Sequence, residues 1–401
     1  MKKTVRETIC ENEHLILSGN ACFSDQSRGR LVDEPETELR TCFQHDRDRV
    51  IHCNSFRRLK HKTQVFYAPS NDHICTRMEH VLHVASIAST ICRPLGLDTE
   101  LAWAIGMGHD LGHTPFGHTG EKIISGLCVE RGLPPFEHEV NSLRAIDFLS
   151  NNGKGLNLTY AVRDGIVSHN GESLNKRLVP TFKKKDMKSI VSRVGLVPAT
   201  YEGVVVRFSD TIAYLGRDFE DASRLGIVDG RDLPEIVKTR LGTTNSQIIT
   251  ALVNDLIEGA DEENGIGFSD YVFEAVKAFS DFNYQYIYRS KIMNGYTEYF
   301  SRLINLILNY LEKLYSSFGL EEKGYLEERN MLAAGFYSHM KEMYPIYMEK
   351  EGSDKRMIMD YIAGMTDNFC LDCANEILKP EHLNDEINQS QTGKWFDVRR
   401  F

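Results

Sequence analysis

The sequence predicts a mainly α-helical protein. Apolar residues recur with the spacing of one helix face along most of the 401 residues. Stretches that alternate apolar and polar residues, as half-buried strands do, are few. Neither an internal repeat nor a Pro- or Ser-rich linker interrupts the chain. We therefore expect it to fold throughout, as one large helical core or as two packed lobes.

The first clear helix covers residues 76–92. His80, Val84, Ile87 and Ile91 lie on one stripe by the i, i+4, i+7, i+11 rule, and a proline and a glycine follow shortly afterwards. This pattern is typical of an amphipathic helix with His80 on its apolar side. A lone histidine in such a position is more often a core residue than a metal ligand.

The next helix is expected over residues 98–108. Asp98 or Thr99 can cap its N-terminus, and glycines release the chain at its C-terminal end. His109 and Asp110 therefore fall where a helix ends, a place where side chains converge without breaking a hydrogen-bond ladder.

Helical spacing recurs along the rest of the chain. The further expected helices cover residues 120–131, 137–150, 159–169, 200–225, 244–259, 266–281, 296–318, 328–349 and 354–378. The stretch 173–198 has no clean period, and we expect a short hairpin or a loop there. Its lysines, Lys183, Lys184 and Lys185, belong either to a solvated loop or to a phosphate-binding surface.

The helix over residues 200–225 has two different faces. Its buried face carries Val204, Phe208, Ile212, Leu215 and Phe219. Its opposite face carries Asp210, Tyr214, Arg217 and Asp218. Such a charged face is a solvated surface or, because a tyrosine lies among the charges, the lining of a cavity.

The composition excludes several classes of protein. No window is apolar enough to cross a membrane, and charges interrupt the N-terminal segment before a signal-peptide core forms. Nine scattered cysteines, an odd number, do not read as a disulfide framework. We therefore expect a cytoplasmic protein with reduced thiols. A net charge of -10 argues against general DNA coating, so an anionic substrate needs local cations.

The histidines concentrate the chemistry in the first half of the chain. Eleven of the fourteen lie between His45 and His169. His80, the pair His109 and Asp110, and the charged face of the helix over residues 200–225 each offer nitrogen or carboxylate donors of the kind that bind a divalent ion. The stretch "HDLGHTPFGHTGE" adds two further imidazoles and a carboxylate beside a glycine-rich turn.

This pattern resembles the H...HD...D signature of the HD superfamily of metal-dependent phosphohydrolases. Longer strings resemble its deoxyguanosinetriphosphate triphosphohydrolase family, from about residue 27 to about residue 370. They are "RTCFQHDRDRVIHCNSFRRLKHKTQVF", "TRMEHVLHVA", "HDLGHTPFGHTGE", "FEHEVNSLR", "GIVSHNGE" and "DYIAGMTDNF". His45 and Asn368 replace residues that are usually basic in the family, and neither belongs to the donor set.

The resemblance implies an architecture and a reaction. We expect an N-terminal arm over residues 1–44, an HD-domain catalytic core over 45–230 and a C-terminal helical region over 231–401 packed on the core. The implied reaction is hydrolysis of a deoxynucleoside triphosphate, with dGTP the first candidate, to deoxynucleoside and inorganic triphosphate. Metal-activated water would attack the α-phosphorus.

The resemblance also implies roles for individual residues. The metal ligands would be His80, His109, Asp110 and Asp210, holding one ion of manganese, magnesium, iron, nickel, cobalt or zinc. The catalytic residues would be His118, Glu121 and His113. The substrate-binding residues would be Arg77, Gln64, Lys62, His138, Tyr214 and Asp218.

Partners and alternatives stay open at this point. The resemblance implies a homo-oligomer, tetramer or hexamer, and an activating dNTP at a subunit interface. Single-stranded DNA is a further conceivable partner that no motif indicates, and no membrane partner is expected. One alternative is an HD-type nucleotidase or phosphodiesterase with another nucleotide substrate. A second is a nucleotide-binding regulator, and a third is a helical protein whose histidines are structural.

Overall fold

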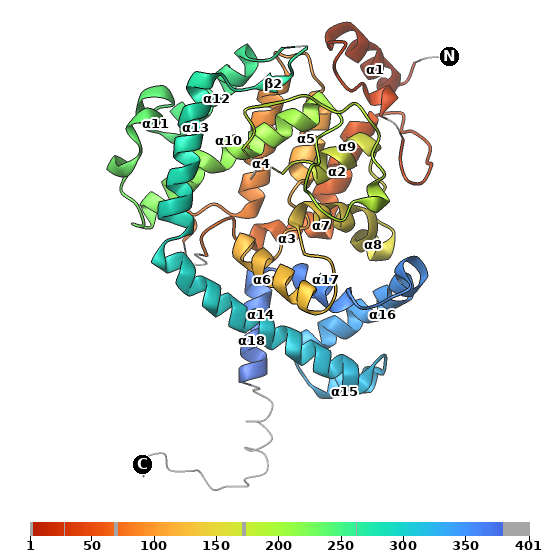
Figure 1. Cartoon of the computed structure of the whole chain (residues 1–401). Helices are drawn as coiled ribbons and strands as arrows, with labels where there is room; N and C mark the ends of the chain where they lie inside the picture. Colours follow the sequence, from red (N-terminus) through yellow and green to blue (C-terminus); the bar gives the residue numbers. More distant parts are fainter. Residues whose placement is uncertain (1–2, 28, 68–70, 171–173, 262, 380–401) are drawn as a thin grey trace, which may run out of the picture.

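The computed structural model is mainly α-helical, as the sequence predicts, and describes residues 3–27, 29–67, 71–170, 174–261 and 263–379. Figure 1 shows α4, α5 and α10 crossing at the centre of the molecule, with the C-terminal helices α14 to α18 along its lower side. Among the described residues, no helix is both long and apolar enough to span a bilayer. All nine cysteines are free thiols.

The helices of the first half are short, apart from α4 and α10. They are α1 (Val5–Ile16), α2 (Cys42–His52), α3 (Asn54–Arg58), α4 (Arg77–Cys92), α5 (Thr99–Gly108), α6 (Gly117–Glu130), α7 (His138–Arg144), the π-helical η3 (Ala145–Leu149), α8 (Ser150–Gly153), α9 (Tyr160–Val167) and α10 (Tyr201–Arg224).

The second half contains the longest helix, α14. Its elements are α11 (Glu235–Arg240), α12 (Asn245–Glu258), α13 (Asp270–Phe282), the π-helical η6 (Asn283–Tyr288), α14 (Lys291–Phe318), α15 (Glu322–Glu327), α16 (Met331–Glu351), α17 (Met357–Ala363) and α18 (Asp367–Leu378).

The central helices begin where the sequence supplies caps. The Thr76 side chain accepts from the Glu79 backbone N–H while Glu79 reaches back to the N–H of Thr76, which closes a capping box at the start of α4. Asp98 caps α5 by accepting from the Leu101 N–H. A Cβ on Gly106 would lie 2.8 Å from the Ala85 Cα, so glycine permits α4 and α5 to approach closely. These local signals fix the entry points of the two helices that supply most of the site.

Two hydrophobic clusters form the core. The larger one joins α2, α4, α5, α9, α10, α12 and α13, and the smaller one joins α6 to α14, α16, α17 and α18. Phe116, just before α6, belongs to the smaller cluster and stacks on Phe300 of α14 at 4.0 Å between ring centroids. The turn between Asp110 and α6 therefore lies where the two clusters meet.

The structure corrects three details of the predicted elements. Strand β1 (Arg177–Leu178) does occur within 173–198, but it pairs antiparallel with β2 (Ile266–Gly267), so the hairpin, one of the two alternatives for this stretch, is wrong. Residue 173 lies outside the described residues. The predicted helix 266–281 begins only at Asp270, because residues 266 and 267 belong to that ribbon. The predicted helix 354–378 is two helices, α17 and α18, separated at Gly364.

Candidate active site

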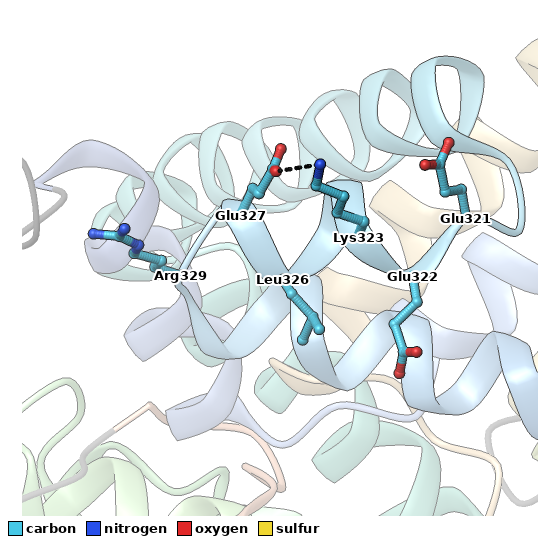
Figure 2. Close-up of a pocket in the computed structure, with 6 residues that line it drawn as sticks. All are labelled: Glu321, Glu322, Lys323, Leu326, Glu327 and Arg329. Atoms are coloured by element: carbon cyan, nitrogen blue, oxygen red, sulfur yellow. Dashed lines mark ion pairs between the residues drawn. The ribbon is translucent and has the colours of Figure 1, made fainter.

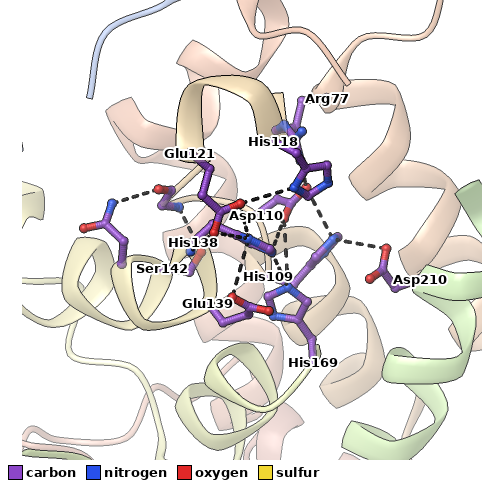
Figure 3. A network of polar contacts seen from close by, with 12 residues as sticks. Arg77, His109, Asp110, His118, Glu121, His138, Glu139, Ser142, His169 and Asp210 are labelled. Carbon is purple, nitrogen blue, oxygen red and sulfur yellow. Dashed lines mark hydrogen bonds and ion pairs between the residues drawn. The ribbon is translucent and has the colours of Figure 1, made fainter. Parts of the chain in front are cut away.

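Four buried donors from three helices converge at the centre of the molecule. The His80 Nε2 of α4 lies 2.9 Å from the Asp210 Oδ1 of α10. His109, at the end of α5, places its Nε2 3.9 Å from the same oxygen and 3.6 Å from the Asp110 Oδ2. The packing of α4, α5 and α10 thus brings together the four residues that the sequence suggested as metal ligands, and Figure 3 shows three of them.

The charged face of α10 is buried. Asp210 is 8 % exposed and Asp218 is 3 % exposed. The alternative of a solvated charged surface is therefore wrong for these two carboxylates, and the face lines the interior that α4 and α5 close.

His109 is prepared to bind an ion. Its Nδ1 lies 2.8 Å from the Gly106 carbonyl, and since a carbonyl only accepts, Nδ1 carries the proton. The Nε2 then offers a lone pair, and it is buried without a hydrogen-bond partner. Burial lowers the pKa of His109 to about 4, so the ring is neutral at physiological pH. A buried, unpartnered nitrogen lone pair beside carboxylates is what a divalent cation requires.

The two carboxylates of the set are ionised. Burial alone would raise the pKa of Asp110, but the Arg77 guanidinium and the neighbouring imidazoles outweigh it and hold that pKa well below its usual range. Burial also opposes ionisation of Asp210, and the hydrogen bond from His80 lowers its pKa nonetheless. Two imidazoles and two carboxylates therefore form a donor set that fits a divalent ion.

Glu121 organises a second group of histidines beside the donors. Its Oε2 lies 3.2 Å from the His118 Nδ1 and 3.0 Å from the His138 Nδ1. The His138 backbone N–H also donates to Glu121 at 2.8 Å. His113 stacks on His138 with 4.5 Å between ring centroids, and both of its ring nitrogens are buried without a hydrogen-bond partner. His118 is the exposed member, with 47 % of its side chain accessible.

The charge states of this group differ because their neighbours differ. Burial raises the pKa of Glu121, yet His138 and His118 outweigh that effect and keep it well below its usual range. Burial would lower the pKa of His138, but Glu121 and Glu139 raise it to about 10. Burial and the nearby Arg77 lower the pKa of His113 well below its usual range. The site therefore holds a charged and a neutral imidazole in contact.

A tight turn separates the donors from the Glu121 group. Phe116 has a left-handed φ of 62°, and Gly117 follows with a φ of 58°. A Cβ on Gly112 would lie 2.1 Å from the Ser142 backbone nitrogen, so only glycine lets the turn contact α7. The Gly112 N–H donates to the Ser142 hydroxyl at 2.9 Å, which ties the turn to the helix that carries His138.

Two of the expected phosphate-binding cations are engaged by the protein itself. Arg77 is 1 % exposed and donates to Asp110 and to the carbonyls of Thr63 and Gln64. The Lys62 Nζ donates to the carbonyls of His113 and Ala363. Arg77 therefore stabilises the Asp110 carboxylate, and Lys62 stabilises the turn that follows it.

The remaining expected substrate contacts lie on two elements. Gln64 is buried, and its Oε1 has no hydrogen-bond partner. Tyr214 is partly buried on α10. Burial raises the pKa of Asp218 to about 7, and the Tyr288 hydroxyl donates to it at 2.5 Å.

The lysine run 183–185 is tied to α9. The Lys185 Nζ pairs with Asp164 at 2.5 Å, and the Lys184 Nζ lies 5.6 Å from the centroid of the Tyr160 ring. These contacts favour a structural role for the two lysines.

Sequence reasoning missed two residues of the site. His169 follows α9, and its Nε2 lies 3.2 Å from the His138 Nε2. Asp367, at the start of α18, accepts from the N–H groups of Phe116 and Thr63 at 2.9 Å each. Both lie within strings that carried the family resemblance, "GIVSHNGE" and "DYIAGMTDNF", which were the available signals.

A hollow over α15 contains none of these residues. It is lined by Glu321, Glu322, Lys323, Leu326, Glu327 and Arg329 (Figure 2). The Lys323 Nζ lies 3.7 Å from Glu327, with both side chains largely exposed. An exposed ion pair of this kind contributes little stability and indicates no chemistry.

Comparison with known proteins places this geometry in a family. Residues 77–212 match the HD domain, and residues 266–376 match the phosphohydrolase-associated domain. A deoxyguanosinetriphosphate triphosphohydrolase-like protein of Caldanaerobacter subterraneus subsp. tengcongensis is 36% identical over 94% of this chain and 96% of its own length. The chain belongs to the deoxyguanosinetriphosphate triphosphohydrolase-like family.

Two other members of this triphosphohydrolase-like family show similar identity over a similar share of their length. The protein of Desulfatibacillum aliphaticivorans is 36% identical over 94% of this chain and 99% of its own length. That of Clostridium tetani is 34% identical over 95% and 98%. Membership confirms the predicted fold class and identifies a metal-dependent phosphohydrolase, and the HD domain implies a divalent metal at the His and Asp cluster.

Proposed function

We propose that this phosphohydrolase cleaves deoxynucleoside triphosphates, with dGTP the first candidate, to deoxynucleoside and inorganic triphosphate. One observation carries the proposal: Asp110 joins two groups of side chains that hydrolysis of a phosphate ester needs together. Its Oδ2 lies 3.6 Å from the His109 Nε2, and its Oδ1 lies 3.8 Å from the His138 Nε2, which Glu121 holds from behind. A phosphorus between these groups meets ion-binding donors on one side and proton carriers on the other.

The bond broken is that between the α-phosphorus and the 5' oxygen. Water adds to phosphorus and loses its proton, while the 5' oxygen leaves and takes a proton. His80, His109, Asp110 and Asp210 would hold a divalent ion, which would supply positive charge to a phosphate oxygen and make water more acidic. A sugar alkoxide is a poor leaving group, so a positioned proton donor is expected to raise the rate by roughly 10²- to 10⁴-fold.

His118 is our candidate for that proton donor. It is the most accessible imidazole of the group, and its Nδ1 lies 3.2 Å from Glu121. The carboxylate fixes the ring and leaves the Nε2 to face the substrate. His113 lies beside it with both nitrogens unpartnered, which suits contact with phosphate oxygens.

The sugar and the base would lie toward α10. We assign Tyr214 to the face of the deoxyribose, where its ring leaves little room for a 2'-hydroxyl. Asp218 and Gln64 would bind polar groups of the sugar or base. The unpartnered Oε1 of Gln64 supports this assignment, because a buried amide oxygen without a partner costs stability unless a ligand supplies one.

Product identification tests the reaction directly. The protein is incubated with each of the four dNTPs, alone and in pairs, and with each of several divalent metals. Deoxynucleoside and triphosphate support the proposal, whereas orthophosphate or pyrophosphate overturns it in favour of a nucleotidase or phosphodiesterase. Faster hydrolysis of one dNTP in the presence of another would support an activating nucleotide site. The metal series would identify the ion that supports hydrolysis.

Exposed large side chains support the proposed homo-oligomer, a tetramer or a hexamer. Large side chains are exposed along η6 and the start of α14, namely Tyr284, Tyr286, Ile292 and Tyr299. Light scattering on the eluting protein, with and without dNTP, tests assembly and its dependence on an activating nucleotide.

A further inference from the structure

We propose that Asp367, the first residue of α18, is a positioning residue that holds the proton donor His118 in place from the C-terminal region. This inference deepens the proposed function and rests on the role given there to His118. Asp367 is 3 % exposed, and both of its carboxylate oxygens accept hydrogen bonds from loops in the first half of the chain. The phosphohydrolase-associated domain, residues 266–376, thereby takes part in a site that is built on the HD domain.

The Asp367 carboxylate joins two loops that are far apart in the sequence. Its Oδ1 accepts from the backbone N–H of Phe116 at 2.9 Å, and its Oδ2 accepts from the backbone N–H of Thr63 at 2.9 Å. The Thr63 hydroxyl donates to the same Oδ2. The two loops also contact each other, since a Cβ on Gly117 would lie 2.9 Å from the Gln64 carbonyl oxygen. One buried carboxylate thus fixes the turn before α6 against the loop that carries Gln64.

Phe116 adopts a backbone conformation that a phenylalanine does not favour. Its φ of 62° and ψ of 28° lie in the left-handed region, which residues other than glycine, asparagine and aspartate rarely occupy. The N–H bond to Asp367 and the stacking of its ring on Phe300, at 4.0 Å between centroids, hold Phe116 in this conformation. His118 follows two residues later in the first turn of α6, so the direction of its ring depends on these contacts.

The N-terminus of α18 is capped by the residue before Asp367. The Thr366 hydroxyl accepts from the Phe369 N–H at 3.2 Å, the usual arrangement at the start of a helix. The carboxylate of Asp367 is therefore not needed as the cap of its own helix, and it bonds to the two loops instead. An acidic residue in the first turn also stabilises a helix through its dipole, but that effect requires no bonds to Phe116 and Thr63.

A second buried side chain ties the same parts of the molecule together. The Lys62 Nζ donates to the carbonyl of His113 in the turn and to that of Ala363 at the end of α17. The helices α17 and α18 are consecutive in the chain. The turn before α6 is thus held against the C-terminal region at two points, His113 and Phe116.

The first measurement follows these contacts without any substrate. Hydrogen–deuterium exchange of the full-length protein reports on the amides of peptides that cover residues 63–67 and 113–118. Both peptides should exchange faster in Asp367→Asn, because an amide side chain offers one acceptor oxygen where the carboxylate offers two. Asp372→Asn is the matched control, since Asp372 is exposed on the same helix, and its peptides should exchange as those of the wild type do.

The second measurement is kcat for the best dNTP, taken below the unfolding temperature of each variant. Asp367→Asn should lower kcat by roughly 10- to 100-fold, the effect of a misplaced catalytic group, whereas Asp372→Asn should keep the wild-type kcat. In a His118→Ala protein, Asp367→Asn should have little further effect on kcat, because the group that it positions is gone. A purely structural role would lower kcat by the same factor in both backgrounds.

Equal loss of kcat in the two backgrounds, or faster exchange in Asp367→Asn with an unchanged kcat, overturns the proposal. If Asp367→Asn does not fold, Thr63→Val decides the question, because it removes only the hydroxyl bond. Its kcat should fall by a smaller factor, and only while His118 is present. A wild-type protein that releases triphosphate from no dNTP refutes the proposed function itself, whereas the exchange data still show whether Asp367 holds the turn.

Discussion

His80 and Asp210 lie 130 positions apart in the sequence, yet the Nε2 of one is 2.9 Å from the Oδ1 of the other. Both are buried, and the packing of α4 against α10 brings them together. The contact uses one ring nitrogen of His80 and one carboxylate oxygen of Asp210, and the His109 Nε2 faces the same oxygen. The packing of two helices far apart in the sequence thus positions two members of the donor set beside each other.

The first prediction concerns the carboxylate of this pair. Asp210→Asn keeps the size of the side chain and an acceptor for His80 but removes the negative charge from the donor set. Removal of a direct ligand should lower metal affinity by more than the roughly 10- to 100-fold that removal of a residue behind a ligand causes. Calorimetric titration of Mn²⁺ into metal-free protein measures it. Asp218→Asn, on the same helix, should retain affinity, and equal losses in both variants would contradict the ligand assignment.

The second prediction separates two glycines of α6. A Cβ on Gly120 would lie 1.8 Å from the Pro115 carbonyl oxygen, whereas a Cβ on Gly126 meets nothing within 4 Å. Gly120→Ala should therefore force the turn open and lower the free energy of unfolding by at least about 2 kcal/mol. Gly126→Ala should raise it by about 0.5–1 kcal/mol, because alanine favours the helix. Urea unfolding of both variants checks the opposite signs, and a shared sign would refute the packing argument.

The sequence was informative where the cause of structure is local. The apolar stripes predicted α4 and α10, and the cap at Asp98 predicted α5, whereas the grouping of His80, His109 and Asp210 was predicted from the family resemblance. The β1–β2 ribbon could not be predicted, since each strand has two residues and its partner lies far along the chain. His169 was missed for a similar reason. A single histidine at a helix end forms no recognisable sequence pattern, and its contact with His138 arises only when two helices pack together.

The third prediction concerns Lys62, which the resemblance assigned to substrate. Burial lowers the pKa of its ammonium well below the usual range, and the Nζ donates to the carbonyls of His113 and Ala363. Lys62→Met should leave these carbonyls unpaired and lower the free energy of unfolding by about 1–3 kcal/mol. The exposed neighbour Lys60 provides the control, since Lys60→Met should change stability by less than about 0.5 kcal/mol.

Kinetics distinguish the two roles of Lys62. If it ties the turn to α17, the Lys62→Met protein, assayed below its unfolding temperature, should keep a KM close to that of the wild type. If the Lys62→Met protein is as stable as the Lys60→Met control but has a much higher KM, Lys62 instead contacts the phosphates of the substrate.

The last prediction is a pH dependence that Asp218 creates. Its folded pKa of about 7 exceeds the ordinary 3.8, so between these values the native state holds a proton that the unfolded chain releases. The contribution of Asp218 to stability is therefore full below about pH 4 and falls as the pH rises toward 7, by roughly 4 kcal/mol at most.

Asp218→Asn keeps an acceptor for Tyr288 and removes the titration. Relative to the wild type, its free energy of unfolding should be similar near pH 4 and higher near pH 8, as measured by urea unfolding across that range. Asp281→Asn, at an exposed aspartate, should show no such trend. A pH-independent difference between Asp218→Asn and the wild type would mean that Asp218 is ionised throughout, held by Tyr288 more strongly than burial opposes it.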